Sequence, residues 1–357
     1  MPTQLDMWNQ IDKTEFDLVI IGGGINGTGI ARDASRRGLK VCLLEMRDIA
    51  YGTSSRSSKL IHGGFRYLEH YQFGLVFEAL RERKTLTKIA PHLVRPMGFI
   101  YPVYKHSKHS LMTVNLGMWL YDALSLFRSP KRHKNLNRSE LSMREPCLEI
   151  QELRGAPLYL DYATDDARLS LETALDASQE GAVICTYAMV SGFHRNEAGE
   201  LRFLTTKNGL TGAEKRVRGK CFINATGAWT DQTLAVAHPG RETMLRPTKG
   251  VHFVVQHEVL PINHAIICVH PKDGRSLFAI PWNTHTYVGT TDTNYTGDPK
   301  AALAEANDIE YMIKAFATYF PKNLIQPSDI ISTWCGIRPL ITPSAANLSE
   351  SAISREH

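Results

Sequence analysis

A chain of 357 residues with 43% hydrophobic side chains is long enough to bury a large core and to form about two globular domains. Its 41 basic side chains outnumber its 36 acidic ones only slightly, and the formal charge of +5 suits an acidic substrate or an anionic lipid surface but is too small to indicate a nucleic-acid-binding protein. No stretch has the run of about 18 uncharged apolar residues that spans a bilayer, and the polar residues 1–15 lack the apolar core of a cleavable signal peptide.

The first predicted element is a buried strand over residues 16–21, which runs directly into a glycine-rich loop and a helix over residues 28–37. In such a strand-loop-helix unit, glycines let the backbone approach a pyrophosphate at the helix N-terminus, where free N–H groups and the helix dipole favour an anion. The motif alone is weakly specific, because similar glycine strings also form tight structural turns. The cofactor-binding candidates in this loop are Gly22, Gly24, Asn26 and Gly27.

A second buried parallel strand is predicted over residues 39–44, with Glu45 at its carboxyl end. Roughly 20 residues after the glycine loop, an acidic side chain at this point accepts hydrogen bonds from the hydroxyls of an adenosine ribose. A solvated carboxylate at a strand end is the alternative interpretation. Because Glu45 would face the ribose phosphate of NADP, the candidates that remain are NAD and FAD.

A segment rich in hydroxyl side chains and paired glycines follows at residues 52–70. So many donors beside a pyrophosphate suit a long cofactor that runs past the second strand. A later buried strand ends in "NATGAW", where Gly227 lets the main chain pack against a cofactor. These two stretches favour FAD over NAD. The further cofactor-binding candidates are Thr53, Ser54, Ser55, Ser58, Lys59, His62, Gly63, Val190, Gly227 and Trp229.

Helices are predicted next over residues 74–89, from their amphipathic spacing, and over 167–179, with Asp165 as the N-cap. Between them, residues 111–127 are apolar apart from Asp122 and are followed by the basic side chains of Arg128, Lys131, Arg132 and Lys134. This segment either lies on a bilayer surface or forms a core helix with a solvated basic loop after it. Both interpretations stay open at the level of sequence.

Strands dominate the second half of the chain, apart from a helix near residues 302–319. The continuous apolar strand 221–225 is typical of a nucleotide-binding sheet, whereas the strands after Met244 suit an antiparallel substrate layer. The other predicted strands cover residues 182–190, 201–206, 251–255, 264–269, 276–280 and 287–290.

The expected fold class is therefore α/β, with a Rossmann-like, doubly wound FAD-binding sheet and a substrate domain built on an antiparallel sheet in α+β fashion. The FAD-binding domain is expected to be discontinuous, over residues 14–100 and 155–243. Residues 101–154 would form a helical and basic insertion, and residues 244–357 the substrate-binding domain.

Several stretches together resemble one family, the FAD-dependent, quinone-linked glycerol-3-phosphate dehydrogenases. The resemblance covers roughly residues 14–357 with the motifs in family order, and "SSKLIHGG" with "RYLEH" is far more specific than a glycine fingerprint. The stretches are "IIGGGINGTGIARDASRRGLKVCLLE", "TSSRSSKLIHGGFRYLEHY", "TDDARL", "NATGAW", "TKGVHFVV", "GTTDTNYTGDP" and "GIRPL".

This resemblance implies FAD as cofactor, sn-glycerol 3-phosphate as substrate and dihydroxyacetone phosphate as product. It also implies that electrons pass to quinone, and that the protein lies peripherally on the cytoplasmic face of the inner membrane. Whether the protein forms a homodimer is left undecided by the sequence. In one respect the sequence departs from the family, whose members continue past the position of His357 into a flavin-closing stretch and a helical C-terminal domain. Two alternatives are therefore kept: a flavin oxidase that uses oxygen, on glycerol phosphate or an amino acid, and a non-catalytic flavin-binding fragment.

Oxidation of a secondary alcohol requires a base that removes the hydroxyl proton while hydride leaves the same carbon, and a positive group beside the developing oxyanion. It requires no metal, and the scattered cysteines show no metal-ligand spacing. An imidazole titrates near neutral pH. We predict His252 as the base and Arg338 as its electrostatic partner, with His62 as the second candidate base.

The resemblance also suggests which side chains hold the substrate. A phosphate ester presents three acceptor oxygens, which a planar guanidinium meets with paired hydrogen bonds. We predict that Arg338 and Arg355 clamp the phosphate, although Arg338 could instead cap a turn and Arg355 could be a terminal side chain. The remaining candidates for substrate binding are Arg66, Tyr67 and Lys249.

Overall fold

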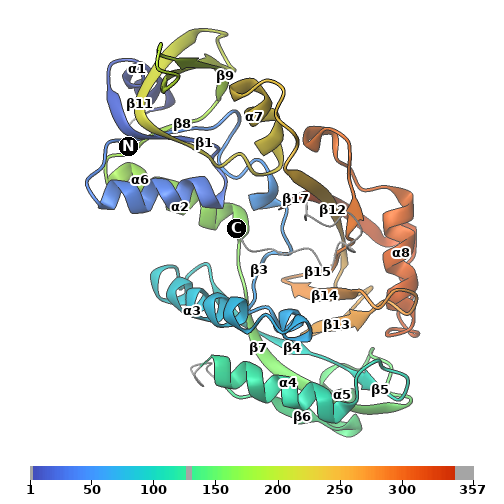
Figure 1. The fold of residues 1–357 in the computed structure, drawn as a ribbon. Coiled ribbons are helices and arrows are strands. Elements are labelled where there is room, and N and C mark those ends of the chain that lie inside the picture. Colours follow the sequence, from blue (N-terminus) through green and yellow to red (C-terminus); the bar gives the residue numbers. More distant parts are fainter. Residues whose placement is uncertain (1–2, 126–130, 342–357) are drawn as a thin grey trace.

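The computed structural model describes residues 3–125 and 131–341, except for the side chains of Arg66, Glu69 and His70. Its strands form two sheets that lie in different parts of the molecule (Figure 1). The first sheet has the order β8-β2-β1-β11-β10-β9. Its strands are β1 (Glu15–Ile21), β2 (Val41–Leu44), β8 (Val183–Cys185), β9 (Ala188–Arg195), β10 (Leu201–Asn208) and β11 (Glu214–Asn224).

The parallel half of this sheet confirms the predicted nucleotide-binding unit. β1 pairs in parallel with β2 on one side and with β11 on the other. Its side chains alternate between two cores: Leu18 and Ile20 pack toward the helices α2 (Ile25–Arg36) and α6 (Asp166–Gln179), and Val19 and Ile21 pack with Trp8 of α1 (Gln4–Gln10). Burial on both faces explains why β1 and β2 are continuous apolar runs.

The second sheet is larger and mostly antiparallel, in the order β16-β12-β15-β14-β13-β4-β7-β3, with β17 paired to β12 and with β5 and β6 paired to β7. The strands after Met244 pair antiparallel, as predicted for this layer. Its strands are β3 (Leu60–Ile61), β4 (Arg95–Ile100), β5 (Val103–Tyr104), β6 (Lys134–Leu136), β7 (Leu153–Ala163), β12 (Leu245–Gln256), β13 (Ala265–Val269), β14 (Ser276–Trp282), β15 (His285–Gly289), β16 (Thr293–Asn294) and β17 (Ile330–Ile341).

The grouping of the early strands differs from the expected domain boundaries. β4 and β7, which the sequence places with the nucleotide-binding part, pair with each other and join the second sheet where β4 runs parallel to β13. The physical reason is long-range pairing: Phe99 of β4 lies opposite Ala265, a partner that local sequence pattern does not reveal.

The predicted helices are present, with shifted ends. They are α2, which begins at Ile25 rather than Thr28, α3 (Phe73–Ile89), α4 (Leu111–Leu124), α6, and α8 (Ala306–Ala317). Asp165 caps α6 as predicted, because its side chain accepts a hydrogen bond from the N–H of Arg168. Three short helices were not predicted: α1, α5 (Arg138–Arg144) and α7 (Thr230–Ala237).

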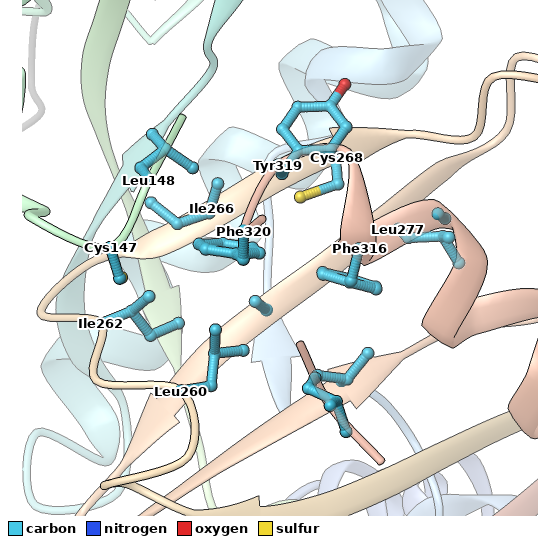
Figure 2. Packing of buried hydrophobic residues seen from close by; sticks show 14 of the residues in the cluster. Cys147, Leu148, Leu260, Ile262, Ile266, Cys268, Leu277, Phe316, Tyr319 and Phe320 are labelled. Carbon is cyan, nitrogen blue, oxygen red and sulfur yellow. The ribbon is translucent and has the colours of Figure 1, made fainter. Parts of the chain in front are cut away.

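One face of the second sheet, here called the back, is covered by α8, and the opposite face is called the front. On the back, α8 packs Met312 and Phe316 against the sheet, and Figure 2 shows Phe316, Tyr319 and Phe320 in contact range of side chains from β13 and β14. Strand alternation sends Val251 and Phe253 of β12 into this core. The intervening residue, His252, therefore faces the front of the sheet.

The helices α3 and α4 cover the far end of that front face (Figure 1). Val76 and Leu80 of α3 and Val114, Met118 and Tyr121 of α4 pack with Phe99 and Tyr159 of the sheet. Within the described residues, none of the helices combines the length and the apolarity needed to cross a bilayer.

Candidate active site

Two adjoining cavities occupy the region between the sheets. The first, of about 530 Å³, lies at the carboxyl ends of β1 and β2 and extends to α7 and the end of β17. The second, of about 310 Å³, lies in front of β12 and β14. Thr53 and Arg338 line both cavities and mark their junction.

The glycines of the loop after β1 have separate physical roles. Gly22 has a φ of +111°, and a Cβ at this position would collide with the carbonyl oxygen of Ala225. A Cβ on Gly27 would likewise collide with the carbonyl oxygen of Gly22, so both glycines are required by the fold. Gly24 is different: it lines the first cavity, has extended backbone and would place a Cβ 3.1 Å from Ser54 Oγ. Its lack of a side chain keeps the N-terminus of α2 accessible from the cavity.

Glu45, the predicted ribose-binding residue, lines the first cavity, and its carboxylate also holds the glycine loop. One carboxylate oxygen accepts a hydrogen bond from Gly23 N–H at 2.6 Å and the other from Arg47 N–H at 2.8 Å. The residue is only 7% exposed, and this burial raises the pKa of the carboxyl group. Each carboxylate oxygen can accept more than one hydrogen bond, so Glu45 can hold the loop and still accept from a ribose hydroxyl.

The hydroxyl-rich segment divides between the cavity walls and the protein interior. Ser54 Oγ accepts a hydrogen bond from Ile25 N–H at the start of α2, and Thr53 Oγ1 donates to the carbonyl of Ile337 at 2.6 Å. Both residues line the first cavity, together with Asn26, Val190, Gly227 and Trp229. Ser55 and Lys59 line neither cavity.

Lys59 instead forms an ion pair with Asp166, which the sequence analysis did not single out. The lysine Nζ lies 2.8 Å from Asp166 Oδ1, and Asp166 Oδ2 accepts hydrogen bonds from the N–H and the hydroxyl of Ser57. Asp166 thereby fixes the turn that carries Ser58. The signal was present in the motif "TDDARL", whose second aspartate follows the N-cap of α6.

His252 is the central polar side chain of the second cavity. It is 2% exposed and stacks on Trp334, with ring centroids 4.7 Å apart. Its Nε2 lies 2.9 Å from Ser58 Oγ, while its Nδ1 has no hydrogen-bond partner among the described residues. Burial, reinforced by the positive charges of Arg338 and Lys59, lowers the pKa of His252 to about 3. The imidazole is therefore neutral near pH 7 and in the form that accepts a proton.

His62, the second candidate base, lies elsewhere in the same cavity. Its Nδ1 accepts a hydrogen bond from Gly64 N–H at 3.1 Å, which places the proton of a neutral ring on Nε2. The turn is fixed from behind by Asp161, which accepts from Gly63 N–H and is paired with the buried Arg83 at 2.7 Å. Burial raises the pKa of the Asp161 carboxyl group. Gly63 itself lines neither cavity, because its Cα faces Leu80 and Tyr121.

Arg338, the predicted electrostatic partner of His252, projects from the strand β17 into the junction of the cavities. It forms an ion pair with Asp292 at 3.1 Å. Two arginines that the sequence analysis missed, Arg56 and Arg275, line the second cavity as well. Of the aspartates in the wall, Asp161 is neutralised by Arg83 and Asp292 offsets one of the three arginines. Arg275 in turn lies 3.6 Å from Asp273, so the described part of the wall carries three guanidinium groups, two of them paired with aspartates.

Lys249 requires a correction. Its side chain points to the back of the second sheet, where it lies 2.7 Å from Asp308 and 3.0 Å from Glu305 at the start of α8. Strand alternation explains this placement, since Gly250 and His252 take the cavity side of β12. Tyr67 does line the second cavity. Arg355 and the side chain of Arg66 lie outside the part of the chain that the structure describes.

The residues present fit an FAD molecule. The first cavity combines a glycine loop that a side chain would fill, the N-terminus of a helix and a buried carboxylate, which are the groups that bind a pyrophosphate and a ribose. The adjoining second cavity gives room for a larger ring system beside a histidine and arginines. Among the described residues, no group of three or more His, Cys, Asp or Glu side chains is arranged to hold a metal ion.

Comparison with known proteins agrees with this fit. The model of the family described as FAD dependent oxidoreductase matches residues 17–352. The chain is 40% identical over 346 residues to an aerobic glycerol-3-phosphate dehydrogenase of Staphylococcus haemolyticus, covering 97% of this chain and 62% of that protein. A protein of the same name from Staphylococcus aureus is 40% identical over 342 residues, which is 96% of this chain and 61% of the relative. The chain therefore spans about three fifths of the length of these curated relatives.

Among solved structures, the glycerol-3-phosphate dehydrogenase of Bacillus halodurans complexed with FAD is similar with a TM-score of 0.79 and 33% identity, over 97% of this chain and 61% of that one. The L-alpha-glycerophosphate oxidase of Mycoplasma pneumoniae with FAD bound has a TM-score of 0.73 at 19% identity, over 93% and 85% of the two chains. The latter likeness shows the shared fold.

Proposed function

The chain belongs to the FAD-dependent oxidoreductase family, and from this premise we propose that it oxidises sn-glycerol 3-phosphate to dihydroxyacetone phosphate by hydride transfer to FAD. The 40% identity to aerobic glycerol-3-phosphate dehydrogenases supports the choice of substrate. The observation that carries the proposal is the second cavity, where three arginine side chains and a buried neutral histidine adjoin the dinucleotide cavity.

The first cavity supplies the groups that would hold FAD. Gly24 and the N-terminus of α2 would bind the pyrophosphate, and Glu45 the ribose. Thr53 and Ser54 connect this region to β17 and to α2 through their own hydrogen bonds, so the pocket is shaped before the cofactor binds. When bound, FAD supplies the acceptor for the hydride.

In the second cavity, His252 would accept the hydroxyl proton of the substrate. Burial, reinforced by the positive charges of Arg338 and Lys59, lowers its pKa and keeps the ring unprotonated. A phosphate dianion in the cavity opposes that positive potential and raises the proton affinity of the imidazole when the substrate is present. Arg338 would stabilise the developing oxyanion or hold the phosphate.

We further infer that quinone is the electron acceptor and that the protein binds the membrane surface. Apolar side chains of α4 are exposed to an unusual degree: Met112 by 80%, Leu116 by 72% and Trp119 by 50%. They recur at helical spacing on the face opposite Val114 and Met118. The exposed basic residues Lys131 and Arg132 follow in the chain, so this surface combines apolar contact with attraction to anionic lipids. A bilayer is also the source of a lipid-soluble quinone.

A test of this function begins with release of the cofactor by denaturation and its identification as FAD. Anaerobic glycerol 3-phosphate should then bleach the flavin absorption, and a soluble quinone should restore it faster than dissolved oxygen does. Rapid reoxidation by oxygen with formation of peroxide would instead establish the oxidase alternative. A flavin that is retained but never bleached by the substrate would identify the non-catalytic alternative.

A further inference from the structure

The segment after β15, residues 290–292 of the motif "GTTDT", holds two arginines from distant parts of the chain on one wall of the second cavity. Arg338 comes from β17, and Arg275 stands immediately before β14.

Thr291 anchors the segment to the central strand. Its side chain is 2% exposed, its hydroxyl accepts a hydrogen bond from Val251 N–H at 3.0 Å, and it donates to the carbonyl of Lys249 at 3.4 Å. The Thr291 side chain thus provides hydrogen bonds to β12 just beyond the point where β15 ends, opposite His252. The segment is fixed relative to β12, the strand that carries His252.

Acceptors of the segment surround the guanidinium of Arg338. Its Nη1 donates to the carbonyl of Thr291 at 3.2 Å and to Asp292 Oδ1 at 3.1 Å, and its Nη2 donates to Thr290 Oγ1 at 3.1 Å. Gly250 provides the space for this arrangement, because a Cβ there would lie 2.7 Å from Nη2 and 2.8 Å from Nη1. The guanidinium therefore has a fixed position across β12.

The same segment holds Arg275. Its Nη1 donates a hydrogen bond to the main-chain carbonyl of Asp292, so one residue binds Arg338 through its side chain and Arg275 through its backbone. On its other side, Arg275 contacts Asp273, which accepts hydrogen bonds from Tyr311 of α8. The side chain is 28% exposed and lines the second cavity.

We propose that residues 290–292 form a cradle that positions Arg338 and Arg275 as the two arms of one anion clamp, and that Arg275 selects substrates with a phosphate group. This inference rests on the proposed function for the identity of the substrate. Each guanidinium is a planar fork of donors that matches phosphate oxygens, and two such groups fixed by one segment lose less entropy on binding.

The first test uses Arg275→Gln in the FAD-loaded protein, with inorganic phosphate as the probe. Binding is measured by calorimetry and by the change in the flavin spectrum. We expect phosphate affinity to fall by on the order of tenfold or more, with Arg275→Lys intermediate, while FAD content and Tm stay unchanged. The matched control is Arg32→Gln, because Arg32 is also an ion-paired arginine with 28% side-chain exposure but belongs to α2 and pairs with Asp176 of α6.

The second test addresses the cradle itself through Thr291→Val, which removes the anchoring hydroxyl without changing the size of the side chain. We expect a several-fold loss of phosphate affinity and of kcat/KM for glycerol 3-phosphate, with slow oxidation of unphosphorylated glycerol preserved. Thr286→Val is the control, since Thr286 is fully buried on β15 and donates to the carbonyl of Leu260 instead.

The outcomes separate this inference from the proposed function. If the parent protein oxidises glycerol 3-phosphate but Arg275→Gln binds phosphate normally, or loses glycerol and glycerol 3-phosphate oxidation equally, the clamp is refuted. If the parent protein binds phosphate through Arg275 but glycerol 3-phosphate never bleaches the flavin, the clamp stands and the proposed substrate is wrong.

Discussion

Replacing Gly24 by valine should weaken FAD binding while leaving the fold intact. Gly24 has φ −76° and ψ 179°, an extended conformation that any residue adopts, and its Cβ would meet Ser54 Oγ at 3.1 Å. The cost in unfolding free energy is therefore about 1 kcal/mol or less. The added methyl groups occupy the cavity at the N-terminus of α2, where the pyrophosphate would approach.

The expected loss of affinity follows from the contacts at that N-terminus. Each charge-assisted hydrogen bond contributes about 1.5–3 kcal/mol. Loss of one or two of them weakens binding by about 3 kcal/mol, which is on the order of 100-fold in Kd. The assay is titration of the cofactor-free protein with FAD, monitored by flavin fluorescence, beside thermal unfolding of the same sample.

Two neighbouring glycines supply the controls. Gly29 lies one turn further along α2 with nothing within 4 Å of its Cβ position, so Gly29→Val should bind FAD normally. Gly27→Val should instead lose stability by about 3 kcal/mol or more, because its Cβ would collide with the Gly22 carbonyl oxygen. An unchanged Kd for Gly24→Val, or equal weakening in Gly29→Val, would refute the assignment of this cavity to the pyrophosphate.

Further predictions concern the second cavity and the exposed face of α4. The pKa of His252 is lowered from 6.5 to about 3 in the folded state, so the unfolded state binds more protons between these pH values and the free energy of unfolding falls as the pH drops through that range. Chemical denaturation at several pH values should therefore show a weaker acid dependence for His252→Gln than for the parent protein. An identical dependence would contradict the burial argument. Arg338→Lys should retain FAD but lose about 2–4 kcal/mol of transition-state stabilisation on glycerol 3-phosphate and little on glycerol, as measured by kcat/KM. The double variant Lys131→Glu, Arg132→Glu should co-sediment less with anionic liposomes than the parent protein does. Added salt should weaken co-sedimentation of the parent protein likewise, because exposed charges are screened over about 8 Å at physiological ionic strength. Unaltered co-sedimentation of the variant would show that these basic residues are only solvated.

The sequence predicts the parts of this site that depend on local pattern. The glycine loop, Glu45 and the strand ending before Gly227 meet in one cavity, because parallel strands bring their carboxyl ends to one edge of a sheet. The two-residue period of a strand, applied to the motif "TKGVHFVV", also predicts that the side chains of Lys249 and His252 lie on opposite faces of β12.

The parts that the sequence does not predict depend on long-range pairing. Arg275 follows a turn and resembles any surface arginine until β14 pairs with β15 and brings it beside Asp292. β4 and β7 carry no signal that assigns them to the second sheet, because their partners lie in distant stretches of the chain.

The most direct test of the proposed reaction is anaerobic stopped-flow mixing of the FAD-loaded protein with sn-glycerol 3-phosphate, protiated or deuterated at C2, while flavin absorption is recorded. Hydride transfer from C2 to FAD predicts bleaching of the oxidised flavin by the protiated substrate and several-fold slower bleaching by the deuterated one. Flavin absorption that stays unchanged with saturating substrate, in protein that demonstrably contains FAD, would contradict the account.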